Sequence, residues 1–177
     1  TQRIQEIVDR MMELTALETQ RGLERSETVP LAPLLHEVAA SAESAAAARQ
    51  IRLHVAIDGN ARVEGDPFLL RRAVSNLLDN AIDFSPPGAE VALALHVGPR
   101  EARISVRDHG QGIPDYAREQ VFEKFYSLAR PHSQKKSTGL GLAFVKEIAG
   151  LHRGRIELAN APRGGAIATL TLPLLSH

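Results

Sequence analysis

The apolar residues of this chain switch repeatedly between two spacings, and this switching is the feature that most constrains its fold. In some stretches they recur every three or four residues, as on one face of a helix, and in others at every second residue, as on one face of a strand. Helices are predicted over residues 2–25, 34–49, 67–84 and 139–154, with a short one near 116–122, and strands over 51–57, 91–97, 102–108, 155–160 and 166–174. Because the two kinds mix without strict strand–helix–strand alternation, we predict an α+β fold, a two-layer α/β sandwich preceded by one long helix.

Composition excludes several classes of function. With 177 residues, of which 44% are hydrophobic, the chain can form one ordinary domain with its own core. Lys and Arg (21 residues) balance Asp and Glu (21 residues), so charge gives no argument for nucleic acid as the main partner. The chain has no Cys, which excludes disulfides, and no apolar run reaches membrane-spanning length. Its first residues already follow a helical pattern without an N-cap, which we interpret as the start of a fragment.

Two Asn residues lie one turn apart in the predicted 67–84 helix, although Asn is a mediocre helix former. On a helical wheel, Asn76 and Asn80 border the apolar arc, with Asp83 beyond them and Phe84 nearer the arc. The amide oxygen of Asn is a hard, neutral ligand that suits a Mg²⁺ ion already holding phosphate oxygens and waters. The alternative is that both side chains only cap neighbouring loops.

A second group of polar residues follows the strand over 102–108. Side chains alternate along a strand, so Asp108 ends an inward-pointing apolar row. A buried carboxylate needs hydrogen-bond donors, and the exocyclic amine of a purine is one such donor. Gly110 and Gly112 would let the backbone approach a flat ligand closely. The alternative is a carboxylate satisfied by loop amides in a tight turn.

The polar stretch at 127–138 has no periodicity, and we expect it to form a long mobile loop. It leads to Gly139 and Gly141 at the start of the last predicted helix, and free N–H groups at a helix start bind phosphates. Arg130, Lys135 and Lys136 could add positive charge there. A Gly-x-Gly pair is also common in plain loops.

Taken in order, four stretches resemble the N, first glycine, F and second glycine boxes of sensor histidine kinases: "NLLDNAIDF", "DHGQGI", "FEKFY" and "TGLGLAFV". Their order and spacing agree with that family, and in detail they look most like the carbon-source-responsive Cre-type sensor kinases. The resemblance implies that residues 28–177 form the ATP-binding catalytic domain, with the fold shared by gyrase-type and chaperone-type ATPases. Residues 1–27 resemble the second helix of the dimerisation and phosphoacceptor hairpin, which is incomplete here.

The resemblance further implies ATP and Mg²⁺ as cofactors. By similarity, Asn80 is the Mg²⁺ ligand, Phe84 lies against adenine, and Asp108 accepts a hydrogen bond from the adenine amine. The implied nucleotide-binding residues are Asn76, Asn80, Phe84, Asp108, Gly110, Gly112, Ile113, Arg130, Lys135, Lys136, Thr138, Gly139, Leu140, Gly141 and Leu142.

The implied activity is transfer of the γ-phosphoryl group to a His rather than to water. The related ATPases carry Glu at the position of Asn76, and an amide cannot act as that general base. None of the seven His residues has the family's phosphoacceptor context, so the acceptor is expected on the rest of the hairpin. Implied partners are that hairpin in a homodimer and a response regulator, and the implied location is the cytoplasmic side of an inner-membrane sensor protein.

Two other functions stay open at this point. One is a gyrase-type ATPase, and the other is a nucleotide-responsive scaffold that has lost phosphotransfer. The scaffold stays open because Asp83 stands where most family members have Lys or Arg, and a carboxylate would repel phosphates.

Overall fold

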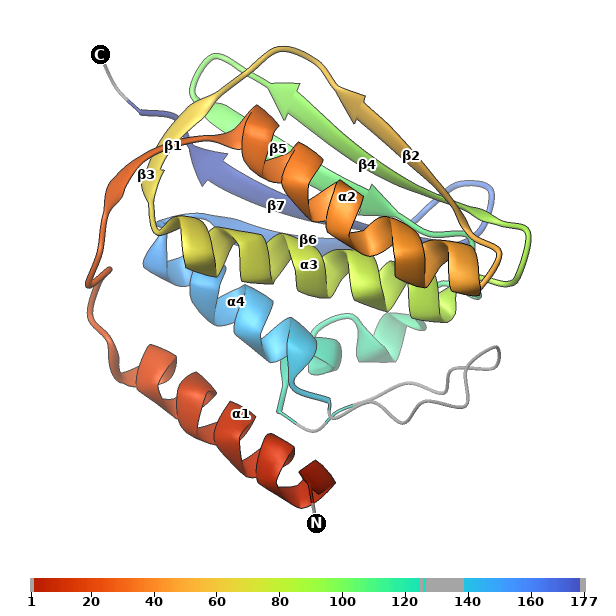
Figure 1. Ribbon diagram of the computed structural model, residues 1–177, viewed down its shortest axis with the longest axis horizontal. Helices are drawn as coiled ribbons and strands as arrows, with labels where there is room; N and C mark the ends of the chain where they lie inside the picture. Colours follow the sequence, from red (N-terminus) through yellow and green to blue (C-terminus); the bar gives the residue numbers. More distant parts are fainter. Residues whose placement is uncertain (1, 125, 127–138, 176–177) are drawn as a thin grey trace.

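The computed structural model describes residues 2–124, 126 and 139–175. Its elements are α1 (Gln2–Thr19), β1 (Glu27–Pro30), α2 (Leu31–Ala48), β2 (Arg52–Ile57), β3 (Arg62–Gly65), α3 (Pro67–Phe84), β4 (Glu90–Val97), β5 (Glu101–Arg107), η1 (Asp115–Ala117), η2 (Gln120–Phe122), α4 (Gly141–Leu151), β6 (Arg155–Asn160) and β7 (Ala166–Pro173). Five strands form one sheet in the order β2-β4-β5-β7-β6, and α2, α3 and α4 cover one of its faces (Figure 1). The predicted α+β sandwich with a leading helix is confirmed.

The sheet is mixed because one pair of its strands is joined by a helical crossover. β2 and β4 run parallel, with α3 between them in the chain, whereas the pairs β4–β5, β5–β7 and β6–β7 are antiparallel. Alternate residues of the central strands are buried under the helices, among them Val91, Leu93 and Leu95 of β4. This alternation is the one that the period-two sequence pattern predicts.

Helix α3 is the central helix of the covering layer and packs against both α2 and α4 (Figure 1). It begins where the sequence favours a start, because the Asp66 carboxylate accepts hydrogen bonds from the backbone N–H groups of Phe68 and Leu69, at 2.9 and 3.4 Å. Pro67 fills the first helical position, which needs no intrahelical hydrogen bond. The apolar arc of α3 is buried, as the helical wheel predicts: Leu70, Ala73, Val74, Leu77, Leu78, Ala81 and Ile82.

A second, two-stranded sheet of β1 and β3 was not predicted from the sequence. The pattern around Thr28–Pro33 indicates a break, but Glu27–Pro30 pairs antiparallel with Arg62–Gly65. Helix α2 then starts at Leu31 rather than at residue 34. The two prolines of this segment are compatible with both features. Pro30 lies at the end of an edge strand, and Pro33 lies in the first turn of a helix.

Other boundaries also differ from the predictions. Helix α1 ends at Thr19, three residues before the helix-disfavouring Gly22, rather than at residue 25. The short helix expected near 116–122 is a pair of 3₁₀ helices, η1 and η2. The polar stretch 127–138 lies outside the described residues.

Helix α1 lies along α4 rather than standing apart from the domain (Figure 1). Leu14 and Leu17 are buried, with 1% and 7% of their surface exposed. Two ion pairs accompany this contact, between Glu13 and Arg72 of α3 and between Glu18 and Lys124, the latter at 2.9 Å. Ile4, Val8 and Met12 remain exposed, so the apolar stripe of α1 is only partly covered.

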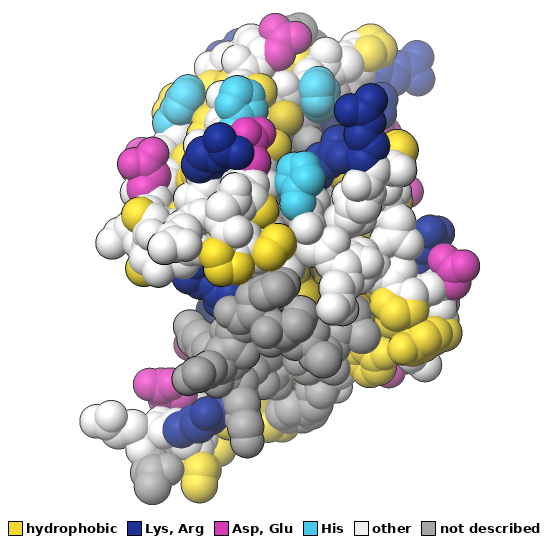
Figure 2. All heavy atoms as spheres, turned by 90° about the vertical axis from the view of Figure 1, so that its right-hand side faces the viewer, with side chains coloured by type: hydrophobic (Ala, Val, Ile, Leu, Met, Phe, Trp, Pro, Cys, Tyr) yellow, Lys and Arg dark blue, Asp and Glu magenta, His cyan; other side chains and the backbone are white. Residues whose placement is uncertain are grey.

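The surface carries both signs of charge. On the face that Figure 2 turns to the viewer, Lys and Arg side chains alternate with Asp, Glu and His. None of the helices in the described part of the chain combines the length and hydrophobicity that a membrane span requires.

Candidate functional site

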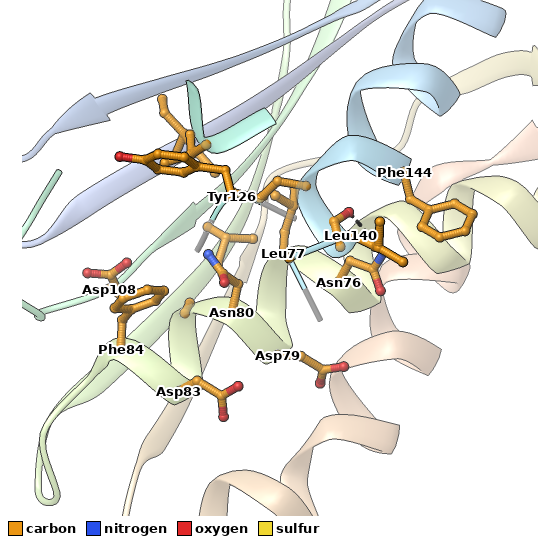
Figure 3. A pocket seen from close by; sticks show the side chains of 18 of the residues that line it. Asn76, Leu77, Asp79, Asn80, Asp83, Phe84, Asp108, Tyr126, Leu140 and Phe144 are labelled. Atoms are coloured by element: carbon orange, nitrogen blue, oxygen red, sulfur yellow. Dashed lines mark hydrogen bonds between the residues drawn. The ribbon is translucent and has the colours of Figure 1, made fainter. Parts of the chain in front are cut away.

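A cavity of about 650 Å³ opens between α1, α3, the start of α4 and the ends of the central strands. This volume falls in the usual range for a small-molecule site. Residues from all predicted motifs line it together: Asn76, Asn80, Asp83, Phe84, Asp108, Gly112, Ile113, Tyr126, Gly139, Leu140, Gly141 and Leu142. Figure 3 shows this cavity from close by, with Phe84 and Asp108 at one end and Asn76 near Leu140 at the other.

The polar row of α3 faces this cavity at helical spacing. Asn76, Asn80 and Phe84 follow one another by four residues, and each lines the cavity while half-buried at the edge of the apolar arc. The Asn76 side chain donates a hydrogen bond from Nδ2 to the backbone oxygen of Gly141, at 3.2 Å. This hydrogen bond connects α3 to the start of α4. The Asn76 side chain therefore has a structural contact of the kind that the alternative interpretation, capping of a neighbouring segment, proposes.

Asp108 is the buried carboxylate of the site, with 8% of its surface exposed. Its Oδ1 accepts hydrogen bonds from the backbone N–H groups of Gly110 and Ala166, both at 3.0 Å. Burial raises the pKa of the Asp108 carboxyl above its ordinary value, and the two amides and His109 oppose this only in part. Both of these hydrogen bonds go to Oδ1, and they hold the carboxylate in place. The carboxylate lines the cavity and can still accept further hydrogen bonds, for example at Oδ2.

Glycines are required around Asp108 because the backbones pass too closely for a side chain. A Cβ on Gly110 would come within 2.4 Å of the Phe84 carbonyl oxygen. A Cβ on Gly165 would come within 2.0 Å of the Asp108 carbonyl oxygen, and Gly165 also has a φ of +84°. Gly110 itself does not line the cavity. Its contribution is to pack against the Phe84 backbone and to donate a hydrogen bond to Asp108.

Asn160 holds the wall of the cavity and was missed by the sequence analysis. Its Oδ1 accepts from the Ile113 N–H at 2.7 Å, and its Nδ2 donates to the Ile113 carbonyl at 2.8 Å. This two-way contact fixes the loop after Gly112 against the end of β6. A polar residue at the end of a predicted strand is too common a signal to have identified it.

The start of α4 faces the other end of the cavity. Gly139 has a φ of +73°, which favours Gly, and Leu140 at the N-cap makes no side-chain capping bond. The N–H groups of this first turn therefore depend on other acceptors, and Gly139, Leu140 and Gly141 all line the cavity. The predicted residues Arg130, Lys135, Lys136 and Thr138 lie outside the described residues.

Asp83 has a partner that the sequence analysis did not anticipate. Arg49, at the C-terminal end of α2, lies 3.4 Å from the Asp83 carboxylate, and both side chains are mostly buried. An opposite charge at this distance offsets much of the field that an isolated carboxylate would exert on a phosphate. The acidic residue at this position is therefore compatible with an anionic ligand in the same cavity.

The donor set fits a metal that arrives with its ligand. Among the described residues, no group of three or more His, Asp or Glu side chains could hold a metal by itself. Asn80 offers a neutral oxygen on the cavity wall. This agrees with the preference of Mg²⁺ for a few protein oxygens combined with phosphate oxygens and waters.

Sequence comparisons agree with the geometry. The family model described as histidine kinase-, DNA gyrase B- and HSP90-like ATPase matches residues 65–176. The sensor protein CreC of Escherichia coli (strain K12) is 40% identical over 170 residues, which cover 96% of this chain and 35% of CreC. The sensor-like histidine kinase SenX3 of Mycolicibacterium smegmatis is 33% identical over 172 residues, covering 97% of this chain and 45% of SenX3. The chain thus spans less than half the length of either relative.

Solved structures give the same result. The mycobacterial sensor histidine kinase MprB superposes with a TM-score of 0.75 and 30% identity, over 86% of this chain and 100% of that one. ShkA, solved in complex with AMPPNP, superposes with a TM-score of 0.84 over 99% of this chain and 36% of its own, and its 24% identity supports the fold alone. The chain therefore belongs to the histidine kinase-, DNA gyrase B- and HSP90-like ATPase family, as the ATP-binding catalytic domain of a sensor histidine kinase.

Proposed function

We propose that this domain binds Mg-ATP and transfers its γ-phosphoryl group to a His on a dimerisation hairpin, for relay to an Asp of a response regulator. One observation carries the proposal. The row Asn76–Asn80–Phe84, the buried Asp108 and the glycine-rich start of α4 face one cavity large enough for a nucleotide.

The end of the cavity at Asp108 suits adenine. Asp108 can accept a hydrogen bond from the exocyclic amine, which guanine does not present at that position. Phe84 lies beside Asp108 (Figure 3), and its ring offers a flat apolar surface for the base. Ile113, held by Asn160, gives a second apolar contact. These features predict a preference for ATP over GTP.

The opposite end suits phosphates. The first turn of α4 offers backbone N–H groups and the positive end of a helix dipole. Asn80 would hold the metal through its amide oxygen, and Asn76 fixes the α4 start that carries the N–H groups. When bound, Mg²⁺ neutralises charge on the phosphate oxygens during transfer. Transfer then needs little covalent help from the protein, because positioning and electrostatics supply most of the rate.

Transfer to His is favoured over hydrolysis because position 76 is Asn. The side-chain amide of Asn76 has no proton-accepting carboxylate and is already bonded to Gly141. The family model also covers gyrase-type ATPases, for which steady hydrolysis by the isolated domain would be expected instead.

The wider assignments belong to the same proposal. Residues 1–27 would be the second helix of the hairpin and residues 28–177 the catalytic domain. The hairpin would assemble as a homodimer, and the whole protein would be a membrane-anchored sensor with this domain on the cytoplasmic side. Support comes from the similarity to CreC and SenX3, whose names describe sensor proteins.

Two measurements test the proposal. Calorimetric titration of ATP should show tighter binding with Mg²⁺ than without it, and Asn80→Ala should remove this difference because the ion loses its protein ligand. With γ-labelled ATP, the chain should not label itself but should label a supplied hairpin that contains the phosphoacceptor His. Acid-labile label on the chain alone, or steady phosphate release at the same rate with and without the hairpin, would contradict the transfer function.

A further inference from the structure

Arg72 lines the cavity but matches none of the residues assigned above. It lies on α3, one turn before Asn76, and its side chain is 33% exposed. Its guanidinium carbon lies 3.8 Å from the centroid of the Phe144 ring, and its Nη1 donates to the carboxylate of Glu13 on α1. The Arg72 side chain therefore lines the cavity and at the same time contacts Phe144 of α4 and Glu13 of α1.

The position of Arg72 along α3 indicates which part of a nucleotide it would meet. Phe84, Asn80, Asn76 and Arg72 follow at four-residue intervals, and four residues advance a helix by about 6 Å. With the base at Phe84 and the metal at Asn80, as proposed above, Arg72 stands beyond the metal. This is the end at which the terminal phosphate and the acceptor of the phosphoryl group would meet.

The environment of Arg72 prepares its guanidinium for an anion. Phe144 is almost fully buried, so its ring provides a fixed surface over which the guanidinium lies. Within the described part of the chain, Glu13 is the one carboxylate that pairs with it, and a guanidinium has five N–H donors. Arg binds phosphate through paired charge-assisted hydrogen bonds, which makes a phosphate a strong competitor for Glu13.

We propose that Arg72 binds the terminal phosphate of ATP and releases Glu13 when it does so. The inference rests on the proposed nucleotide function. While Arg72 pairs with Glu13, it helps to hold α1 on the domain. When it turns to the phosphate, α1 loses its ion pair with Arg72. By linkage, a docked α1 and a bound terminal phosphate then oppose each other by the same factor in both directions. ADP, which lacks that phosphate, should have no such effect.

Nucleotide affinities test the exchange. Glu13→Gln removes the competing carboxylate, so a non-hydrolysable ATP analogue should bind severalfold more tightly while ADP binding stays constant. Arg72→Gln should weaken the analogue about tenfold or more, the usual loss for a charge-assisted hydrogen bond, and again spare ADP. Arg72→Lys keeps the charge without the planar fork and should recover only part of that loss.

Glu18→Gln is the matched control. It removes the ion pair between α1 and Lys124, a residue that does not line the cavity. It should therefore loosen α1 but raise the affinity for the analogue less than Glu13→Gln does. Equal gains for both variants would mean that releasing α1 is sufficient and that Arg72 has no special part. Hydrogen exchange gives a second reading, because the analogue, and not ADP, should increase exchange of the amides at residues 10–18.

The outcomes separate this inference from the proposed function. If the wild-type chain binds the analogue and ADP but none of the Arg72 or Glu13 variants changes their affinity ratio, the inference is wrong and the nucleotide function stands. If the wild-type chain binds neither nucleotide, the proposed function fails first.

Discussion

At the scale of single residues, Asp108 combines a cost to folding with a use in binding. Burial raises the pKa of its carboxyl from the ordinary value of 3.8. As the pH rises through the window between the ordinary and the raised pKa, the folded domain holds more protons than the unfolded chain. The free energy of unfolding therefore decreases as the pH rises through that window. Ionisation of Asp108 thus lowers the stability of the fold. The presence of a carboxylate at this position is therefore explained more readily by ligand recognition than by a contribution to folding.

Asp108→Asn tests this interpretation. The Asn oxygen can accept the same two backbone hydrogen bonds without carrying a charge, so the free energy of unfolding at pH 7 should stay constant or increase. ATP should bind about tenfold more weakly or worse, because an adenine amine would lose a charged acceptor. Urea unfolding and calorimetry measure the two quantities on the same protein. A variant that is less stable and yet binds ATP normally would make Asp108 a structural residue.

At the scale of elements, the two helices that flank the cavity are tied together by a buried imidazole. His152, at the C-terminal end of α4, accepts a hydrogen bond at Nε2 from the Asp66 N–H at 3.0 Å, where α3 begins. Its Nδ1 lies 2.7 Å from the Ile148 carbonyl oxygen, which assigns the proton to Nδ1. A Cβ on Gly65 would come within 2.5 Å of the imidazole ring, so the absence of a side chain at Gly65 makes room for the ring.

This imidazole predicts a loss of stability in weak acid. Burial lowers the pKa of His152 below its ordinary 6.5, because the charged form is poorly solvated. The stabilising contribution is therefore complete above about pH 6.5 and is lost as the pH falls below that value. Urea unfolding between pH 8 and pH 5 should show this decline. His152→Gln should lower the free energy of unfolding at pH 8 by about 1–3 kcal/mol and reduce the decline.

His54, exposed on β2, provides the control for this experiment. His54→Gln should retain both the stability and the pH dependence of the wild-type domain. If His152→Gln also retains the full decline, the titrating group lies elsewhere.

At the scale of the whole molecule, α1 divides its apolar residues between two surfaces. Leu14 and Leu17 pack against the domain, whereas Ile4, Val8 and Met12 are exposed at four-residue spacing. Leu14 and Leu17 are already covered, whereas the row of Ile4, Val8 and Met12 is available for association.

We predict that the chain self-associates through this row. Ile4→Glu with Met12→Glu should raise the dissociation constant roughly tenfold or more, since each large apolar side chain contributes about 1.5–3 kcal/mol on burial. Light scattering over a range of concentrations measures the change. Substitution is preferable to deletion of residues 1–25, which would also expose the surface that Leu14 and Leu17 cover. Phe68→Glu, at another exposed apolar side chain, is the control, and an equal effect there would place the interface elsewhere.

Much of the fold and of the site could be predicted from the sequence because the relevant signals are local. The period of the apolar residues identifies α3 and the central strands, and the Asp66–Pro67 pair marks the start of α3. Asn76 and Asn80 are found by the same wheel that finds the core, and Asp108 by the alternation of its strand. In each case the signal lies within a few residues of the feature it predicts.

The tertiary structure alone decided the contacts between distant segments. Arg72 meets Glu13 across 59 positions, and Asp66 meets His152 across 86. Asp83, isolated in the sequence, is paired with Arg49 from another helix. The four-residue strands β1 and β3 are too short to show a period, and each pairs with a strand that is distant in the sequence. The amino-acid sequence by itself determined which residue types face the cavity, because helix and strand geometry is repetitive. The partners of those residues depend on how the helices and strands pack, which no local pattern records.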